Sequence, residues 1–280
     1  MGTADPRLNT ALKTDFRIQR MLASWKREDP PANRVEPIPT SVIRRIAYIA
    51  QHLPLDAHFL RAVANMIIIA FFLLLRPGEY TDSASDTTPF TLVNVQMFIG
   101  NRRLDLATDS DATLYQARSA SLTFTTQKNG VENEVVRLGL SGHHYLCLVR
   151  AIGRRVCHLR SHNAPLSTPL ARVYTGPGQR TCSVKPSNIT DTLRKAVKFL
   201  GADLGFLPSE VSARSLRAAG AMALLVAEVD PDIIHILGCW RSDEMFRYLH
   251  LTAEPIMRNF AKKMLAANYT LAPHQLVPCH

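Results

Sequence analysis

Arg214, Arg217, Trp240 and Tyr248 have the side-chain types needed to hold and attack a phosphate. Arg214 and Arg217 are three residues apart on an expected helix, so they should share one helix face. Two guanidinium groups can bind a phosphate through paired, charge-assisted hydrogen bonds, and a tyrosine oxygen can attack it. The chain also carries a formal net charge of +10. Together these features predict chemistry on DNA strands.

Most of the positive charge lies in one part of the chain. Residues 141–200 contain ten lysines and arginines but a single acidic residue, Asp191. Such a local excess attracts polyanions, although a solvated, solubilising surface is the alternative interpretation. The residues that we expect to contact DNA are Arg150, Arg154, Arg155, Arg180, Lys185, Arg194 and Lys195.

Helices should position these side chains in the N-terminal half. Apolar spacing predicts helices over Leu8–Lys26, Thr40–His52 and about Asp56–Leu75, the last ending at Pro77-Gly78. The proline-rich and charged segment Arg27–Pro39 reads as a linker. The apolar run that ends at Leu75 has 14 residues, whereas a membrane span needs about 20, so a buried core helix is expected.

Strands are expected between Thr91 and Leu140, where apolar and polar residues alternate. One hairpin would turn at Gly100-Asn101, and a stronger one at Asn129-Gly130. Further helices are expected over Gly142–Leu159, Asn188–Leu200, from Ser209 or Ser212 to Ala227, from Asp230-Pro231 to Gly238, and from Ser242 through Tyr248, with a loop-like stretch up to Pro186. The fold class is therefore a mainly helical α+β domain with a small antiparallel sheet.

Neither a metal site nor a disulfide framework is expected. The five cysteines are scattered and form no CxxC pair, which fits a reducing compartment. His143, His144 and Cys147 could lie on one helical turn, but a second ligand pair is missing, so a surface or partly buried turn is the preferred interpretation. The N-terminus has no apolar signal-peptide region, which predicts an intracellular protein.

Four segments, which together carry five candidate residues, resemble in order the motifs of the tyrosine recombinase (phage integrase) superfamily. They are LLLRPGEY around Arg76, TFTTQKNG with Lys128, SLRAAGAMALL with Arg217, and LGCWRSDEMFRYLH with both Trp240 and Tyr248. The similarity covers about Thr40 to Ala267, and the last segment is most similar to recombinases of eukaryotic mobile elements such as Cryptons.

The resemblance implies a role for each of these residues. Tyr248 would attack a DNA phosphodiester to give a 3′-phosphotyrosine, with Arg76 and Arg217 holding the phosphate oxygens. Lys128 would protonate the leaving 5′ oxygen, and the indole N–H of Trp240 would bind the phosphate. No metal and no cofactor is implied. The partner would be double-stranded DNA, bound by a homo-multimer in the nucleus or, in a prokaryote, the cytoplasm.

Two departures from the family pattern favour a second interpretation. Arg214 stands where the family usually has a histidine, and an arginine does not release a proton near neutral pH. Residues 1–39 would be only a remnant of an N-terminal DNA-clamping domain with its linker, followed by a catalytic domain over 40–270 and a tail over 271–280. A decayed or domesticated recombinase that binds DNA without cutting it is therefore the alternative. A basic RNA-binding protein is a third possibility, but the chain lacks the aromatic strand motif of RRM domains.

The segment Glu254–Ala267 would form a helix that docks on a neighbouring protomer or on its own domain.

Overall fold

The computed structural model describes residues 36–83, 88–124, 134–175, 180–201 and 204–238. All of them belong to one compact unit that begins at Val35. The expected helices over Leu8–Lys26 and from Ser242 lie outside the described residues, as do Lys128, Trp240 and Tyr248.

The described part is mainly helical, with two small antiparallel sheets, which confirms the predicted fold class. The helices are α2 (Thr40–His52), α3 (His58–Phe72), α4 (Pro77–Tyr80), α5 (Asp111–Tyr115), α6 (Leu148–Arg160), α7 (Pro186–Leu200), α8 (Ser215–Val226) and α9 (Pro231–Leu237), with 3₁₀ turns at Leu92–Asn94 and Pro208–Glu210. The strands are β1 (Val95–Ile99), β2 (Arg102–Arg103), β3 (Ser119–Phe124), β4 (Glu134–Gly139), β5 (Arg172–Thr175) and β6 (Arg180–Ser183).

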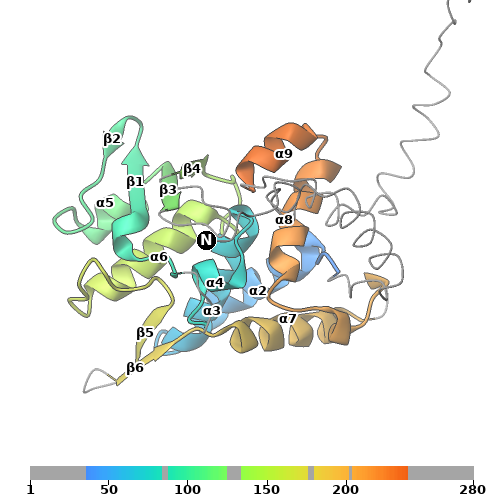
Figure 1. The fold of residues 1–280 in the computed structure, drawn as a ribbon. Helices are drawn as coiled ribbons and strands as arrows, with labels where there is room; N and C mark the ends of the chain where they lie inside the picture. The colour runs from blue at the N-terminus through green and yellow to red at the C-terminus, as the bar shows by residue number, and fades with distance from the viewer. Residues whose placement is uncertain (1–35, 84–87, 125–133, 176–179, 202–203, 239–280) are drawn as a thin grey trace, which may run out of the picture. The chain divides into compact units, whose positions relative to one another are not determined.

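Helix α3 is the centre of the core. Its residues from Ala62 to Phe71 are all buried, and the helix contacts α2, α6, α7, α8 and strand β5 (Figure 1). This explains why the run is apolar on every side, as expected for a helix that is covered all round. Among the described residues, no helix is both long and apolar enough to cross a membrane.

The larger sheet has the strand order β2-β1-β3-β4, and every pair is antiparallel. Val95 pairs with Leu122, which in turn pairs with Val136, so these buried side chains share one face of the sheet. Helix α6 packs against β3 and β4. The predicted turn at Gly100 joins β1 to β2 with a positive φ of 59°, which suits glycine. The hairpin of β3 and β4 is likewise as predicted, although its tip is outside the described residues.

Three expectations about element boundaries are wrong. Helix α6 begins at Leu148, because residues 142–147 form a turn instead of the predicted first helical turn. Strands β5 and β6 pair within the stretch expected to be loop; with four residues each, they are too short for an apolar period to emerge. Helix α8 begins at Ser215, later than either predicted serine cap, because Pro208–Glu210 forms a separate 3₁₀ turn.

Candidate functional site

The guanidinium of Arg217 joins three segments that are far apart in the sequence. Arg217 is 5% exposed on α8, and it donates hydrogen bonds to the carbonyl oxygens of Leu74 and Gly238, the latter at 2.6 Å. Leu74 follows α3, and Gly238 is the C-cap of α9. Carbonyl groups at helix C-termini carry partial negative charge, so they help to offset the cost of burying this cation.

The end of α3 is shaped to receive Arg217. The N–H groups of Leu73 and Leu75 donate to the carbonyls of Ile69 and Ala70, and Leu74 between them has a φ of 51°. Such a left-handed residue after a helix is usually glycine, and another residue there costs about 1–2 kcal/mol. The cost is tolerated here because the Leu74 side chain is buried in a small cluster with Ala221 and Ile234 of α8 and α9.

Helix α8 also approaches the end of α3 very closely. A Cβ atom added to Gly220 would lie 2.4 Å from the carbonyl oxygen of Phe71 and 3.2 Å from Leu74 Cδ2. Only glycine allows the two backbones to come this near. Gly220 and Arg217 are one helical turn apart, so the close approach and the hydrogen bond to Leu74 fix the same part of α8.

Arg76 is the N-cap of α4, four residues after the end of α3. The helix predicted over about Asp56–Leu75 therefore ends earlier, at Phe72, and Pro77 occupies the first turn of a new short helix, where a missing N–H costs nothing. The carboxylate of Glu79 accepts hydrogen bonds from the backbone N–H of Arg76 at 2.7 Å and from its Nη1 at 3.0 Å. Glu79 is 3% exposed, whereas the Arg76 side chain is 25% exposed. Glu79 thus orients a guanidinium that still reaches solvent.

Tyr80 links α4 to the segment that leads into α8. Its buried hydroxyl donates to the carbonyl oxygen of Ala213 at 3.2 Å, and burial raises the pKa of Tyr80 well above its usual value. The backbone N–H of Ala213 donates to Thr190 Oγ1 of α7 at 3.0 Å. Arg194 of α7 donates to the carbonyl oxygens of Val211 and Ser209 at 3.0 and 3.1 Å. Glu79 and Tyr80 were not among the predicted site residues, although both belong to the LLLRPGEY segment.

Arg214 differs from Arg217 in burial. It precedes α8 as its N-cap residue and is exposed, and its backbone N–H donates to Ser212 Oγ at 3.3 Å. The expectation that both arginines share one helix face is therefore wrong, because Arg214 precedes α8 and is exposed whereas Arg217 is turned into the core. Within the described part of the chain, no hydrogen bond or ion pair holds the Arg214 guanidinium.

The predicted DNA-contacting residues divide into exposed and interior groups. Arg150, Arg180, Lys185, Arg194 and Lys195 are exposed, although the Arg194 guanidinium is held by Val211 and Ser209. Arg155 is 2% exposed, and its Nε donates to the carbonyl oxygen of Leu170 at 2.9 Å. We therefore withdraw Arg155 as a DNA contact, because its guanidinium serves the core. Arg154 is partly buried, and its Nε donates to Asn65 Oδ1 at 2.8 Å.

The interior location changes the charge equilibria of α6. Burial lowers the pKa of Arg155 to about 10, the direction expected for a desolvated cation. Burial, with a further contribution from Arg155, lowers the pKa of His158 to about 3. The His158 Nε2 accepts a hydrogen bond from the backbone N–H of Tyr174 at 3.1 Å, which requires the neutral ring.

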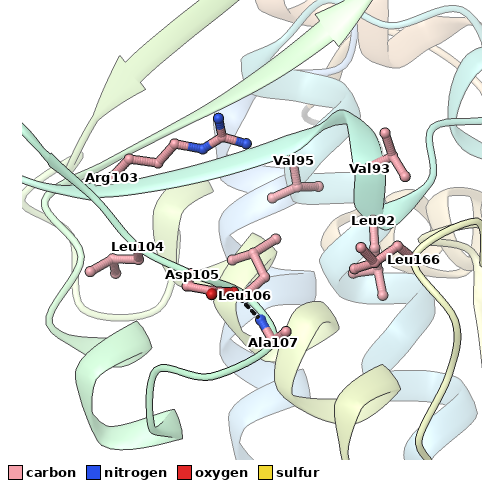
Figure 2. Close-up of a pocket in the computed structure, with 9 residues that line it drawn as sticks. All are labelled: Leu92, Val93, Val95, Arg103, Leu104, Asp105, Leu106, Ala107 and Leu166. Carbon is pink, nitrogen blue, oxygen red and sulfur yellow. Dashed lines mark hydrogen bonds between the residues drawn. The ribbon is translucent and has the colours of Figure 1, made fainter.

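We also searched the described residues for a metal-binding cluster and for a pocket. The described residues contain no group of three or more His, Cys, Asp or Glu side chains placed to hold a metal ion. A hollow of about 370 Å³ is lined mainly by apolar side chains such as Leu92, Val95 and Leu106, with Arg103 and Asp105 also in its wall (Figure 2). None of the residues lining this hollow is among the predicted site residues.

Comparison with known proteins gives matches to solved structures only. No protein-family model matches the chain, and neither does any curated protein. The crystal structure of XerA recombinase has a TM-score of 0.49 and 16% identity, covering 86% of this chain and 67% of that one. XerH site-specific recombinase bound to its difH substrate has a TM-score of 0.49 and 9% identity, covering 91% and 67%. The Tn1549 transposon integrase in complex with transposon right-end DNA has a TM-score of 0.47 and 12% identity, covering 92% and 75%. All three are solved structures of a recombinase or an integrase, each with a TM-score below 0.5 and an identity of 16% or less to this chain.

Proposed function

We propose that this chain breaks and rejoins DNA strands as a member of the tyrosine recombinase superfamily. One observation supports the proposal most strongly. The guanidinium of Arg217 binds the carbonyl of Leu74, two residues before Arg76, and the carbonyl of Gly238, two residues before Trp240. Three of the segments that resemble the family motifs therefore meet at one buried side chain.

The proposed reaction follows from the residue types. The Tyr248 oxygen attacks the phosphorus, the bond to the 5′ oxygen breaks, and Lys128 supplies the proton that the leaving oxygen takes up. A tyrosine has a pKa of about 10, so the attack needs a proton acceptor and a phosphate neutralised by cations. Arg76, which Glu79 orients and which remains partly exposed, supplies one of these cations. Losing one such donor to the transition state costs about 10²–10³ in rate.

The rest of the proposal concerns assembly. The 3′-phosphotyrosine bond keeps the energy of the broken phosphodiester, so rejoining needs no nucleotide cofactor. Strand exchange requires more than one cleaved strand, so the enzyme would act as a multimer on paired sites of duplex DNA. The exposed cations Arg150, Arg180, Lys185 and Lys195 would add phosphate contacts on the duplex.

Covalent trapping on a nicked suicide DNA substrate tests the proposal. The wild-type chain should give a protein–DNA adduct that withstands denaturing electrophoresis, and Tyr248→Phe should give none. Tyr115→Phe is a matched control, because Tyr115 is 54% exposed and lies outside all four motif segments. Salt-sensitive DNA binding without an adduct in the wild type would refute the enzymatic proposal.

That second outcome would support a DNA-binding protein without catalytic activity. The position and exposure of Arg214 favour this alternative, because the residue stands where a proton-transferring histidine is expected. Arg214→His separates the two functions. If the lost histidine is the only defect, the adduct should form faster in this variant than in the wild type. If the wild type forms the adduct and Arg214→His forms it at the same rate, Arg214 does not impair catalysis.

A further inference from the structure

Aromatic rings and one arginine form a contiguous, partly exposed group on α2 and the segments next to it. Tyr48 of this helix is 42% exposed, and its ring centroid lies 4.3 Å from that of His52 and 5.7 Å from that of Tyr145. The His143 ring lies 4.4 Å from that of Tyr145 and extends the group into the turn before α6. We call these residues, with Arg45 and Phe199, the aromatic strip.

Phe199 continues the strip onto the C-terminal end of α7. Its side chain is 69% exposed, although a phenylalanine of this size is normally covered in a folded domain. The Arg45 guanidinium carbon lies 4.6 Å from the Phe199 ring centroid and 5.8 Å from that of Tyr48. Arg45 therefore bridges two exposed rings through cation–π contacts.

The surroundings of the aromatic strip are positively charged. Helix α2, residues 141–150 and residues 193–200 contain neither aspartate nor glutamate. Arg44, four residues before Tyr48 on α2, and Lys198, next to Phe199 in the sequence of α7, are exposed. A ligand that covered this surface would meet flat apolar faces and cations together, with no acidic group from these three segments.

We propose that the aromatic strip binds single-stranded nucleic acid. Exposed bases stack on aromatic rings whatever their sequence, while arginines and lysines neutralise the phosphates between them. A duplex cannot offer its base faces to Tyr48 and Phe199, because they are stacked on one another. An acidic peptide could pair with the cations but has few flat groups for the rings. This binding is independent of cleavage by Tyr248, because the strip contains none of the residues to which that reaction is assigned.

Fluorescence anisotropy with a labelled 15-nucleotide oligo(dT) and the full chain tests the proposal. The double substitution Tyr48→Leu with Phe199→Leu removes two stacking rings but keeps the charge and an apolar side chain at each position. Each base–aromatic stack contributes about 1–3 kcal/mol, so the Kd should rise at least about 25-fold. Tyr115→Leu, at an exposed tyrosine of α5 outside the aromatic strip, should change the Kd less than about twofold. High exposure of both rings means that the double variant should keep the thermal midpoint of the wild type.

Three results would overturn the proposal. The first is no binding of oligo(dT) by the wild type, or an unchanged Kd in the double variant. The second is an equal loss of affinity for a blunt duplex of the same length, which would make the strip part of a duplex-binding surface. The third is ring-dependent binding of a polyglutamate peptide that oligo(dT) does not displace, which would identify an acidic protein partner instead. None of these results depends on adduct formation, so they are distinguishable from failure of the DNA-cleavage proposal.

Discussion

Replacing Gly220 with alanine should destabilise the protein, although alanine is the better helix former. In the interior of α8 the exchange would gain about 0.8–1 kcal/mol from helix propensity alone. The new Cβ, however, would lie 2.4 Å from the Phe71 carbonyl oxygen, and real Cβ atoms essentially never come closer than 3.0 Å to a neighbour. Helix α8 must therefore move away from α3 by more than half an ångström.

The cost of this movement exceeds the gain. Forcing an extra carbon into a packed contact costs about 1–3 kcal/mol, and weakening the Arg217 bond to Leu74 on the same turn adds about 1 kcal/mol. The net loss of unfolding free energy should be about 1–3 kcal/mol. For a chain of this size, that lowers the melting temperature by about 2–12 °C.

Gly153 provides the matched control. It lies in the interior of α6, but a Cβ there would meet only Met97 Cε at 3.4 Å and Tyr115 Cδ1 at 4.0 Å, which are ordinary contacts. Gly153→Ala should therefore raise the unfolding free energy by up to about 1 kcal/mol, and the melting temperature should rise with it. Urea and thermal unfolding of both variants measure the difference in sign. A Gly220→Ala protein as stable as the wild type would refute the argument that α8 is held against the end of α3.

Two further predictions concern α6. The pKa of His158 is lowered in the folded protein, so as the pH falls below about 6.5 the unfolded chain protonates His158 before the folded protein does. The unfolding free energy should therefore decrease as the pH falls from 6.5 to 5. The decrease should be about 0.5 kcal/mol per pH unit, because the ring is partly solvated. Urea midpoints at several pH values measure this, and His158→Gln, which keeps an acceptor for Tyr174, should flatten the dependence; an equally steep slope in that variant would contradict it. Arg155→Met should lower the unfolding free energy by about 2–4 kcal/mol, because the Leu170 and Arg172 carbonyls lose their buried donor, whereas Arg150→Met at an exposed position should change it by less than about 0.5 kcal/mol. Equal effects of the two arginine substitutions in urea unfolding would show that burial of Arg155 has no energetic role.

The fold class and the longer elements could be predicted because their signals are local. The apolar period of Thr40–His52 matches α2 at both ends, and Asp230 caps α9 by accepting a hydrogen bond from the Asp232 N–H. Strands β5 and β6 could not be predicted, because four-residue strands are specified by their pairing more than by their own sequence. The end of α3 was missed for a similar reason: Leu74 adopts a left-handed conformation because α8 and α9 bury its side chain, and that tertiary contact has no sequence signature.

The candidate site could be predicted in part. Arg76 and Arg217 were identified from sequence, but their environments were not, because burial depends on tertiary contacts. Arg217 binds Leu74, and Arg155 binds carbonyls in the loop and strand that follow its own helix. An arginine that binds backbone carbonyls has the same local sequence pattern as one that faces solvent. Charge counts along residues 141–200 therefore overestimated the number of cations available to DNA.

The Arg217 bond to Gly238 also sets a limit on how far the chain beyond it can reach. Tyr248 follows ten residues after this attachment point, and an extended chain spans about 3.3–3.6 Å per residue. The covalent chain therefore keeps the Tyr248 Cα within about 35 Å of Gly238, and the hydrogen bond attaches Gly238, the centre of that radius, to Arg217 of α8. Inserting or deleting residues between the two positions would change this maximum distance without altering any side chain of the site. The number of residues between Gly238 and Tyr248 therefore limits the positions that the tyrosine can reach.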